Sequence, residues 1–150
     1  MKRLVTLFSV LIVAIWYISS LALPTTAVAQ TAQKDRLVLM KTIGGNMKKL
    51  KMAGDTETMA TSAKIIIETA KKLSAKGLWP KGSHGGETRA KEEIWQDMVD
   101  FMAKLKATKN AAVNLLKVSM GGNLGDAKNA FGAMGRTCGG CHKLYRIPKF

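Results

Sequence analysis

The strongest constraint on the fold is a repeated 4-3 spacing of apolar residues in four segments of the chain. Residues spaced alternately four and three apart form one stripe along an α-helix, the seam of a helix packed at a shallow angle against its neighbours. No segment alternates as a β-strand would. The sequence therefore predicts an all-α protein, an antiparallel four-helix bundle. The four stripes are Arg36, Met40, Ile43, Met47 and Leu50; Met59, Ala63, Ile66, Ala70 and Leu73; Ile94, Met98, Phe101, Leu105, Thr108, Ala112 and Leu115; and Ala127, Phe131, Met134, Cys138, Cys141 and Tyr145.

Turn-forming residues separate these segments. Asp55 or Thr56, after a glycine, is suited to cap the second helix. Residues 77–88 carry four glycines and a proline, so they predict a long loop between the second and third helices. Residues 121–125 carry three more glycines, and Asp126 follows them at a position suited to the positive start of the fourth helix. These breaks predict a bundle with one longer connection.

The last helix carries a Cys-Gly-Gly-Cys-His sequence at residues 138–142, which is the attachment signature of a c-type haem. On a helix, Cys138, Cys141 and His142 lie on one face, because residues three and four apart are neighbours there. Both sulfurs can then bond to one porphyrin, and the imidazole can reach its iron. Both cysteines also lie on the helix seam, so we expect one covalent haem c in the core of the bundle, held by the C-terminal helix.

Three other interpretations of the motif each lack a required part. A structural zinc site needs four ligands, and the chain could supply them only with His84 and with His142, which is poorly placed for the same ion as Cys138 and Cys141. A thioredoxin-like redox pair needs a surrounding βαβ pattern, which is absent from the sequence. A disulfide between the two cysteines would leave the adjacent histidine unexplained.

The N-terminus resembles an export signal. Two basic residues precede an uncharged run from Leu4 to Leu23, and Ala27-Val28-Ala29 fits a signal peptidase site. We therefore expect residues 1–29 to be a cleaved signal peptide and residues 30–150 to be one periplasmic cytochrome domain. The uncharged run has 20 residues, long enough to span a bilayer, so an uncleaved anchor in the inner membrane is the alternative.

Residues 30–150 are strongly basic. They hold 22 Lys and Arg against 10 Asp and Glu, a net charge of +12. Such a charge raises the question of nucleic acid binding, but an exported protein does not meet nucleic acid, and no single arm concentrates the basic residues. We expect electrostatic attraction to acidic redox partner proteins or to anionic membrane surfaces instead.

The chain resembles cytochrome c′ and its six-coordinate relatives, a family in which the haem motif lies near the C-terminus of a four-helix bundle. The resemblance covers residues 33–150. The segments that match are 35–41 and 43–47 in the first helix, the glycine loop 85–88 before 93–95, and the motif 138–142 followed by Tyr145 and Arg146.

This resemblance implies roles for individual residues. His142 is expected to be the axial iron ligand, and Met40 is expected to lie over the iron on the opposite, distal side. Arg36, one turn before Met40, matches a family position that contacts a haem propionate, as a guanidinium suits a carboxylate. Arg146 matches a basic residue near the proximal pocket, although it could equally complement the helix dipole. A homodimer, common in the family, is a further expectation.

The function depends on Met40. If its thioether binds iron, the protein is a six-coordinate, low-spin electron carrier. If it only fills space, the iron is five-coordinate and admits a small gas such as nitric oxide (NO) or carbon monoxide (CO). We favour the five-coordinate form, with single-electron transfer or gas binding as the function. A peroxidase would need a distal acid–base pair, and Ile43, Gly44 and Met47 offer none, so we do not expect an enzyme.

Three aromatic side chains in or near the glycine loop are expected to have no chemical role. Trp79 and Trp95 could serve as steps for electron transfer, but packing at one end of the bundle is the simpler interpretation. His84 is expected to be exposed to solvent.

Overall fold

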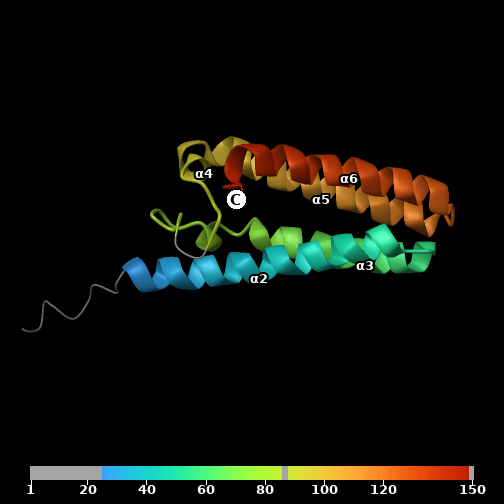
Figure 1. The fold of residues 1–150 in the computed structure, drawn as a ribbon, viewed down its shortest axis with the longest axis horizontal. Coiled ribbons are helices and arrows are strands. Elements are labelled where there is room, and N and C mark those ends of the chain that lie inside the picture. Colours follow the sequence, from blue (N-terminus) through green and yellow to red (C-terminus); the bar gives the residue numbers. More distant parts are fainter. Residues whose placement is uncertain (1–24, 86–87, 149–150) are drawn as a thin grey trace, which may run out of the picture.

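The computed structural model describes residues 25–85 and 88–148, and it confirms the predicted four-helix bundle. Consecutive long helices run antiparallel, with α2 and α3 in one layer and α5 and α6 in the other (Figure 1). A short 3-10 helix and a one-turn helix lie in the connection between the layers. The elements are α2 (Thr25–Met52), α3 (Thr56–Leu73), η1 (Lys76–Leu78), α4 (Glu93–Gln96), α5 (Met98–Met120) and α6 (Leu124–Tyr145).

The helices α3 and α6 each begin after a tight turn, at the places where the turn-forming residues predict a break. The Asp55 side chain accepts a hydrogen bond from the backbone N–H of Thr58 at 2.6 Å and so caps α3. Asn123 caps α6 in the same way, accepting from the N–H of Asp126 at 3.1 Å. Such side chains satisfy backbone donors that the first turn of a helix leaves unpaired. Gly122 has a φ of 79°, which a glycine adopts without strain.

The third helix differs from the prediction. The 4-3 stripe predicts one helix from Ile94 onward, but Asp97 leaves the helical conformation with φ −131° and ψ 68°. Its side chain accepts from the N–H of Asp100 at 2.9 Å, so it ends α4 and caps α5. The apolar spacing continues through this break because Ile94 is buried on the same side of the bundle. Spacing alone does not reveal a cap inside a stripe.

A backbone pairing that the sequence does not predict ties the long connection to the C-terminus. Ala90 and Arg146 form an isolated antiparallel β-bridge. Beside it, the N–H of Lys91 donates to the carbonyl of Tyr145 at 3.1 Å, and the N–H of Ile147 donates to the carbonyl of Arg89 at 2.8 Å. The end of α6 is therefore held against residues 89–91.

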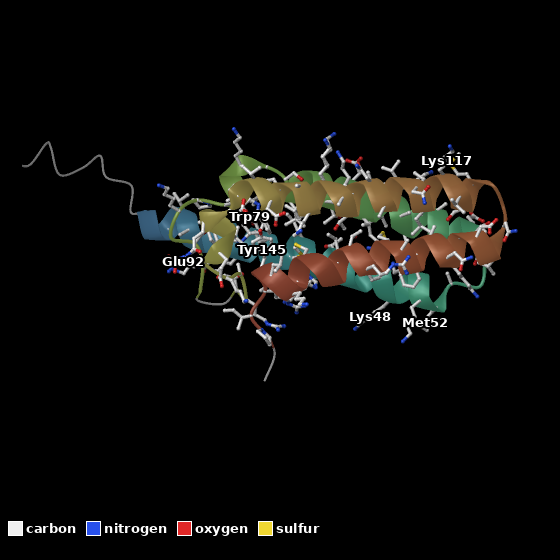
Figure 2. The ribbon with its side chains drawn as sticks, turned by 90° about the horizontal axis from the view of Figure 1, so that it is seen from above. Lys48, Met52, Trp79, Glu92, Lys117 and Tyr145 are labelled. Atoms are coloured by element: carbon white, nitrogen blue, oxygen red, sulfur yellow. The ribbon has the colours of Figure 1, made fainter. Side chains whose placement is uncertain are left out.

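Two separate clusters of buried side chains form the core. Figure 2 shows that Trp79 and Tyr145 lie at one end of the bundle, and Met52 and Lys117 lie at the other. The first cluster, which we call the far core, holds Leu50, Ala53, Met59, Ala63, Ile66, Ala112, Leu115, Ala127, Ala130 and Met134. The second, the near core, holds Leu73, Trp79, Ile94, Phe101, Leu105, Cys141 and Tyr145. The near core packs beside the long connection, and it includes one of the two cysteines.

Most of the predicted signal peptide, residues 1–24, lies outside the described residues, and its last five residues form the start of α2. Over 25–85 and 88–148, no helix combines the length and the apolar character needed to cross a membrane.

Candidate functional site

A cavity of about 490 Å³ opens beside the near core and contains the haem motif. Its volume is in the range of small-molecule and cofactor sites. Helix α6 contributes Cys138, Cys141 and His142 to one wall, so the structure brings the three motif residues together at one cavity. Other parts of the wall come from α2, α3, α5 and the long connection.

Both cysteines lie at this wall. Cys141 is buried, Cys138 is partly buried, and the two are not joined by a disulfide. Burial raises the pKa of Cys138, and burial together with the neighbouring Cys138 raises the pKa of Cys141 to about 11. Among the described residues no three His, Cys, Asp or Glu side chains gather as metal ligands. The pair is thus placed for thioether bonds to a group inside the cavity.

His142 presents a neutral imidazole to the same cavity. The side chain is half-buried, and burial is the main cause that lowers its pKa below the ordinary value of 6.5. The positive charges of Arg146 and Arg89 lower it further. A neutral imidazole is the form that binds a metal. The structure therefore suits His142 to the axial ligand role that the sequence predicts.

The opposite wall is apolar and belongs to α2. Met40, Ile43, Gly44 and Met47 line it, in agreement with the stripe along the first helix. These side chains offer a small molecule an apolar surface without a hydrogen-bond donor.

Arg36 lines the cavity and is almost completely buried, with 2% of the residue exposed. It holds the long connection in place, because Nη1 donates to the carbonyl of Leu78 at 2.6 Å and to Ser83 Oγ at 2.8 Å, and Nη2 donates to the carbonyl of Ser83. Its charge also lies 4.6 Å from the centre of the Trp79 ring, a cation–π distance. Burial lowers the pKa of Arg36 to about 10, so the group keeps its charge at neutral pH.

The hydrogen bonds of Arg36 also indicate whether the cavity fits a haem. Nε of Arg36 is buried and has no hydrogen-bond partner in the described residues. A buried donor without a partner is unfavourable by about 1–3 kcal/mol. A carboxylate reaching this edge of the cavity would accept from it, and a haem carries two propionates. The thiol pair, the neutral imidazole and this unpaired donor together fit a covalent haem with a propionate at Arg36.

The two tryptophans have the packing role that we predicted. Trp79 is buried and donates from Nε1 to the carbonyl of Leu73 at 2.8 Å. Trp95 donates from Nε1 to the carbonyl of Trp79 at 3.1 Å. His84 is exposed, as expected, and its ring lies 5.8 Å from that of Trp95. These groups support the connection that Arg36 holds.

Sequence reasoning missed two features of the site. The first is the contribution of the long connection, since Thr88, Arg89 and Ala90 all line the cavity. The second is a polar contact at its rim, where the Tyr145 hydroxyl donates to Asp100 Oδ2 at 2.5 Å. Lys104 lies 3.3 Å from the other oxygen of that carboxylate. The sequence hints at this network only through Asp100 and Lys104, two opposite charges one helical turn apart.

Known proteins resemble this chain in sequence and in fold. The model of the family described as Cytochrome C' matches residues 31–146. Cytochrome c′ from Alcaligenes xylosoxydans xylosoxydans is 32% identical over 119 residues, which cover 78% of this chain and 91% of that protein. The solved cytochrome c′ from Shewanella frigidimarina has a TM-score of 0.71 at 26% identity, covering 80% of this chain and 97% of that one. Another solved structure, of a cytochrome c′ with an unusual ligand-controlled dimer dissociation, also has a TM-score of 0.71, at 28% identity and the same coverage.

Proposed function

Because this chain belongs to the cytochrome c′ family, which binds covalent haem c, we propose that it is a periplasmic haem protein that exchanges single electrons and binds small neutral gases. We assign Cys138 and Cys141 to the thioether bonds, His142 to the axial position and Arg36 to a propionate. When bound, haem c supplies an iron that changes between ferrous and ferric states and can accept a gas at an open position.

The observation that carries this proposal is the contrast between the two walls of the cavity. The α6 wall offers the His142 imidazole, whereas Met40, Ile43 and Met47 on the α2 wall offer apolar side chains. An apolar wall disfavours polar or anionic ligands, which must lose water without gaining a hydrogen bond. NO and CO need no such partner. The α2 wall also supplies no His, Asp or Glu to the cavity among the described residues, which supports a binding protein over a peroxidase.

Met40 is the residue on which the alternative depends. In our proposal its side chain packs over the distal side without binding iron, as a flexible thioether can. In the alternative it is the sixth ligand, and the protein is a low-spin electron carrier. Both forms place Met40 on the α2 wall, so a measurement has to separate them.

The test compares Met40→Ala with Met47→Ala, which removes the same side chain further along the same wall. In our proposal the ferrous protein is high-spin, and Met40→Ala speeds CO association by about tenfold, which corresponds to about 1.4 kcal/mol of barrier. Redox potential should change little. Absorption spectra and stopped-flow CO binding are the measurements. A low-spin ferrous spectrum that Met40→Ala abolishes and Met47→Ala preserves would establish the six-coordinate alternative.

A further inference from the structure

The C-terminal end of α6 forms a mixed apolar and basic surface, which we call the C-terminal patch and define as Arg89, Lys143, Leu144, Arg146 and Ile147. Leu144 is 45% exposed and Ile147 is 37% exposed. Lys143 and Arg146, next to them in the chain, are exposed as well, and Arg89 is partly exposed. Exposed apolar side chains near arginines are common at protein–protein interfaces.

The backbone of this patch is held in one arrangement. Ile147 N–H donates to the carbonyl of Arg89, and the bridge between Ala90 and Arg146 lies beside that bond. These contacts connect the loop that carries Arg89 to the tail that carries Arg146. A surface that is already ordered loses less conformational freedom when a partner binds.

The positive charges of the patch form no ion pair within the described part of the protein. The ion pairs among residues 25–85 and 88–148 are Lys91 with Glu93 and Lys104 with Asp100, and neither includes a residue of the patch. Three cations thus lie close to two exposed apolar side chains. This chemistry fits an acidic partner better than a neutral one, because opposite charges steer association and fix orientation.

Two residues of the patch also belong to the cavity wall. Arg89 and Arg146 line the cavity together with His142, and they reach the surface of the protein. A partner on the patch would therefore lie near the group held by His142, which directly precedes Lys143 in the chain.

We propose that the C-terminal patch is the docking surface for an acidic single-electron protein. This proposal rests on the electron-transfer function proposed above and adds the surface where it takes place. In the reducing direction the partner loses one electron, and the ferric iron gains it.

The test uses the ferric holoprotein and two electron donors of different kinds. One is a reduced plant-type [2Fe–2S] ferredoxin, a small acidic protein, and the other is the methyl viologen radical cation, which needs no docking surface. Lys143→Glu alters the patch. Lys117→Glu makes the same charge change at the opposite end of the bundle (Figure 2) and is the matched control. Leu144→Ser removes part of the apolar centre and keeps the charge.

We expect Lys143→Glu to slow reduction by ferredoxin about tenfold at low ionic strength, and the difference to disappear at about 0.5 M salt. Lys117→Glu should change this rate less than about twofold, because its charge lies far from the docked partner. Leu144→Ser should slow reduction by ferredoxin and leave the rate of reduction by methyl viologen unchanged.

Equal slowing by Lys143→Glu and Lys117→Glu would overturn the proposal, since only the overall charge would then matter. It would also be overturned if Lys143→Glu released the protein from anionic lipid vesicles and left the ferredoxin rate unchanged, which would make the patch a membrane-binding surface. Failure of methyl viologen to reduce the unchanged protein would instead contradict the electron-transfer function itself.

Discussion

Single polar contacts link the cavity to the helices around it. Arg36 joins the first helix to the long connection through its bonds to Leu78 and Ser83. Tyr145 joins the last helix to α5 through Asp100, and its ring also packs edge-on against Phe101 with 5.2 Å between ring centres. Arg36 is itself the proposed propionate contact, and Tyr145 lies one turn after His142, the proposed iron ligand. Their positions show how the orientation of the site depends on side chains that touch no iron.

The contact between Tyr145 and Asp100 should make stability depend on pH. The hydrogen bond from Tyr145 is the main cause that lowers the pKa of Asp100, so its stabilisation is present above about pH 4, the ordinary carboxyl range, and is lost as pH falls below it. The same bond raises the pKa of Tyr145, so its stabilisation is present below about pH 10 and is lost as pH rises further.

Tyr145→Phe keeps the ring and removes the hydroxyl. Thermal unfolding of the holoprotein, followed by circular dichroism, should give a lower Tm for this variant between about pH 5 and pH 9, and the two proteins should converge outside that range. Asp100→Asn serves as a second variant that weakens the same contact. A difference in Tm that stays constant from pH 3 to pH 11 would show that the hydroxyl contributes by packing alone.

At the scale of whole elements, the first helix raises a question about the mature N-terminus. Helix α2 begins at Thr25, so the expected cleavage after Ala29 falls within its first two turns. Ala27 is exposed, and Val28 is 50% exposed. In the described structure the side-chain hydrogen bond that reaches residues 27–29 comes from Thr31 Oγ1 to the carbonyl of Ala27, at 3.0 Å. These residues contribute little to packing, so cleavage should leave the rest of α2 intact.

We therefore expect N-terminal sequencing of the periplasmic protein to begin at Gln30 or within a residue or two of it. Cleavage removes the first residues of α2 and their backbone hydrogen bonds. The holoprotein should lose only on the order of 1 kcal/mol of unfolding free energy, because bonds at an exposed helix end are exchanged for bonds to water. Ala29→Glu, which spoils the small-residue site, is the control and should leave the uncleaved chain in the membrane fraction. Recovery of the unchanged protein at full length from membranes would establish the anchored alternative.

The whole molecule divides into two halves of different character. None of the buried residues of the far core lines the cavity, whereas those of the near core do. The near-core side chains that line the cavity have no protein neighbours on that side, so they rely on the haem for packing contacts. The near half should therefore depend on the haem that fills it.

Replacing both attachment cysteines tests this dependence. In Cys138→Ser/Cys141→Ser we expect the near half to lose stable packing while the far half keeps part of its helix. Hydrogen exchange should show amides near Leu73 and Leu105 losing protection by more than about 100-fold, and amides near Ile66 and Leu115 losing less. The unchanged chain produced without haem attachment is the control and should behave in the same way. Uniform protection in both halves would contradict the expected dependence.

The sequence by itself determined the features that depend on near neighbours in the chain. Helix seams, N-caps and the Cys-x-x-Cys-His motif all follow from residues three or four positions apart, because one helical turn brings such residues together. Asp97 shows the limit of this reasoning, since a cap inside an apolar stripe leaves the spacing unchanged.

Only the tertiary structure decided how distant segments meet. The partner of Arg36 at Ser83, 47 residues away, and the bridge between Ala90 and Arg146 depend on the path of the long connection. That path is set by the near core and by glycines such as Gly82, with a φ of 75°, and no periodic pattern encodes it. The physical reason is that such contacts form only once the helices have packed, so their geometry belongs to the whole bundle and to no single segment of sequence.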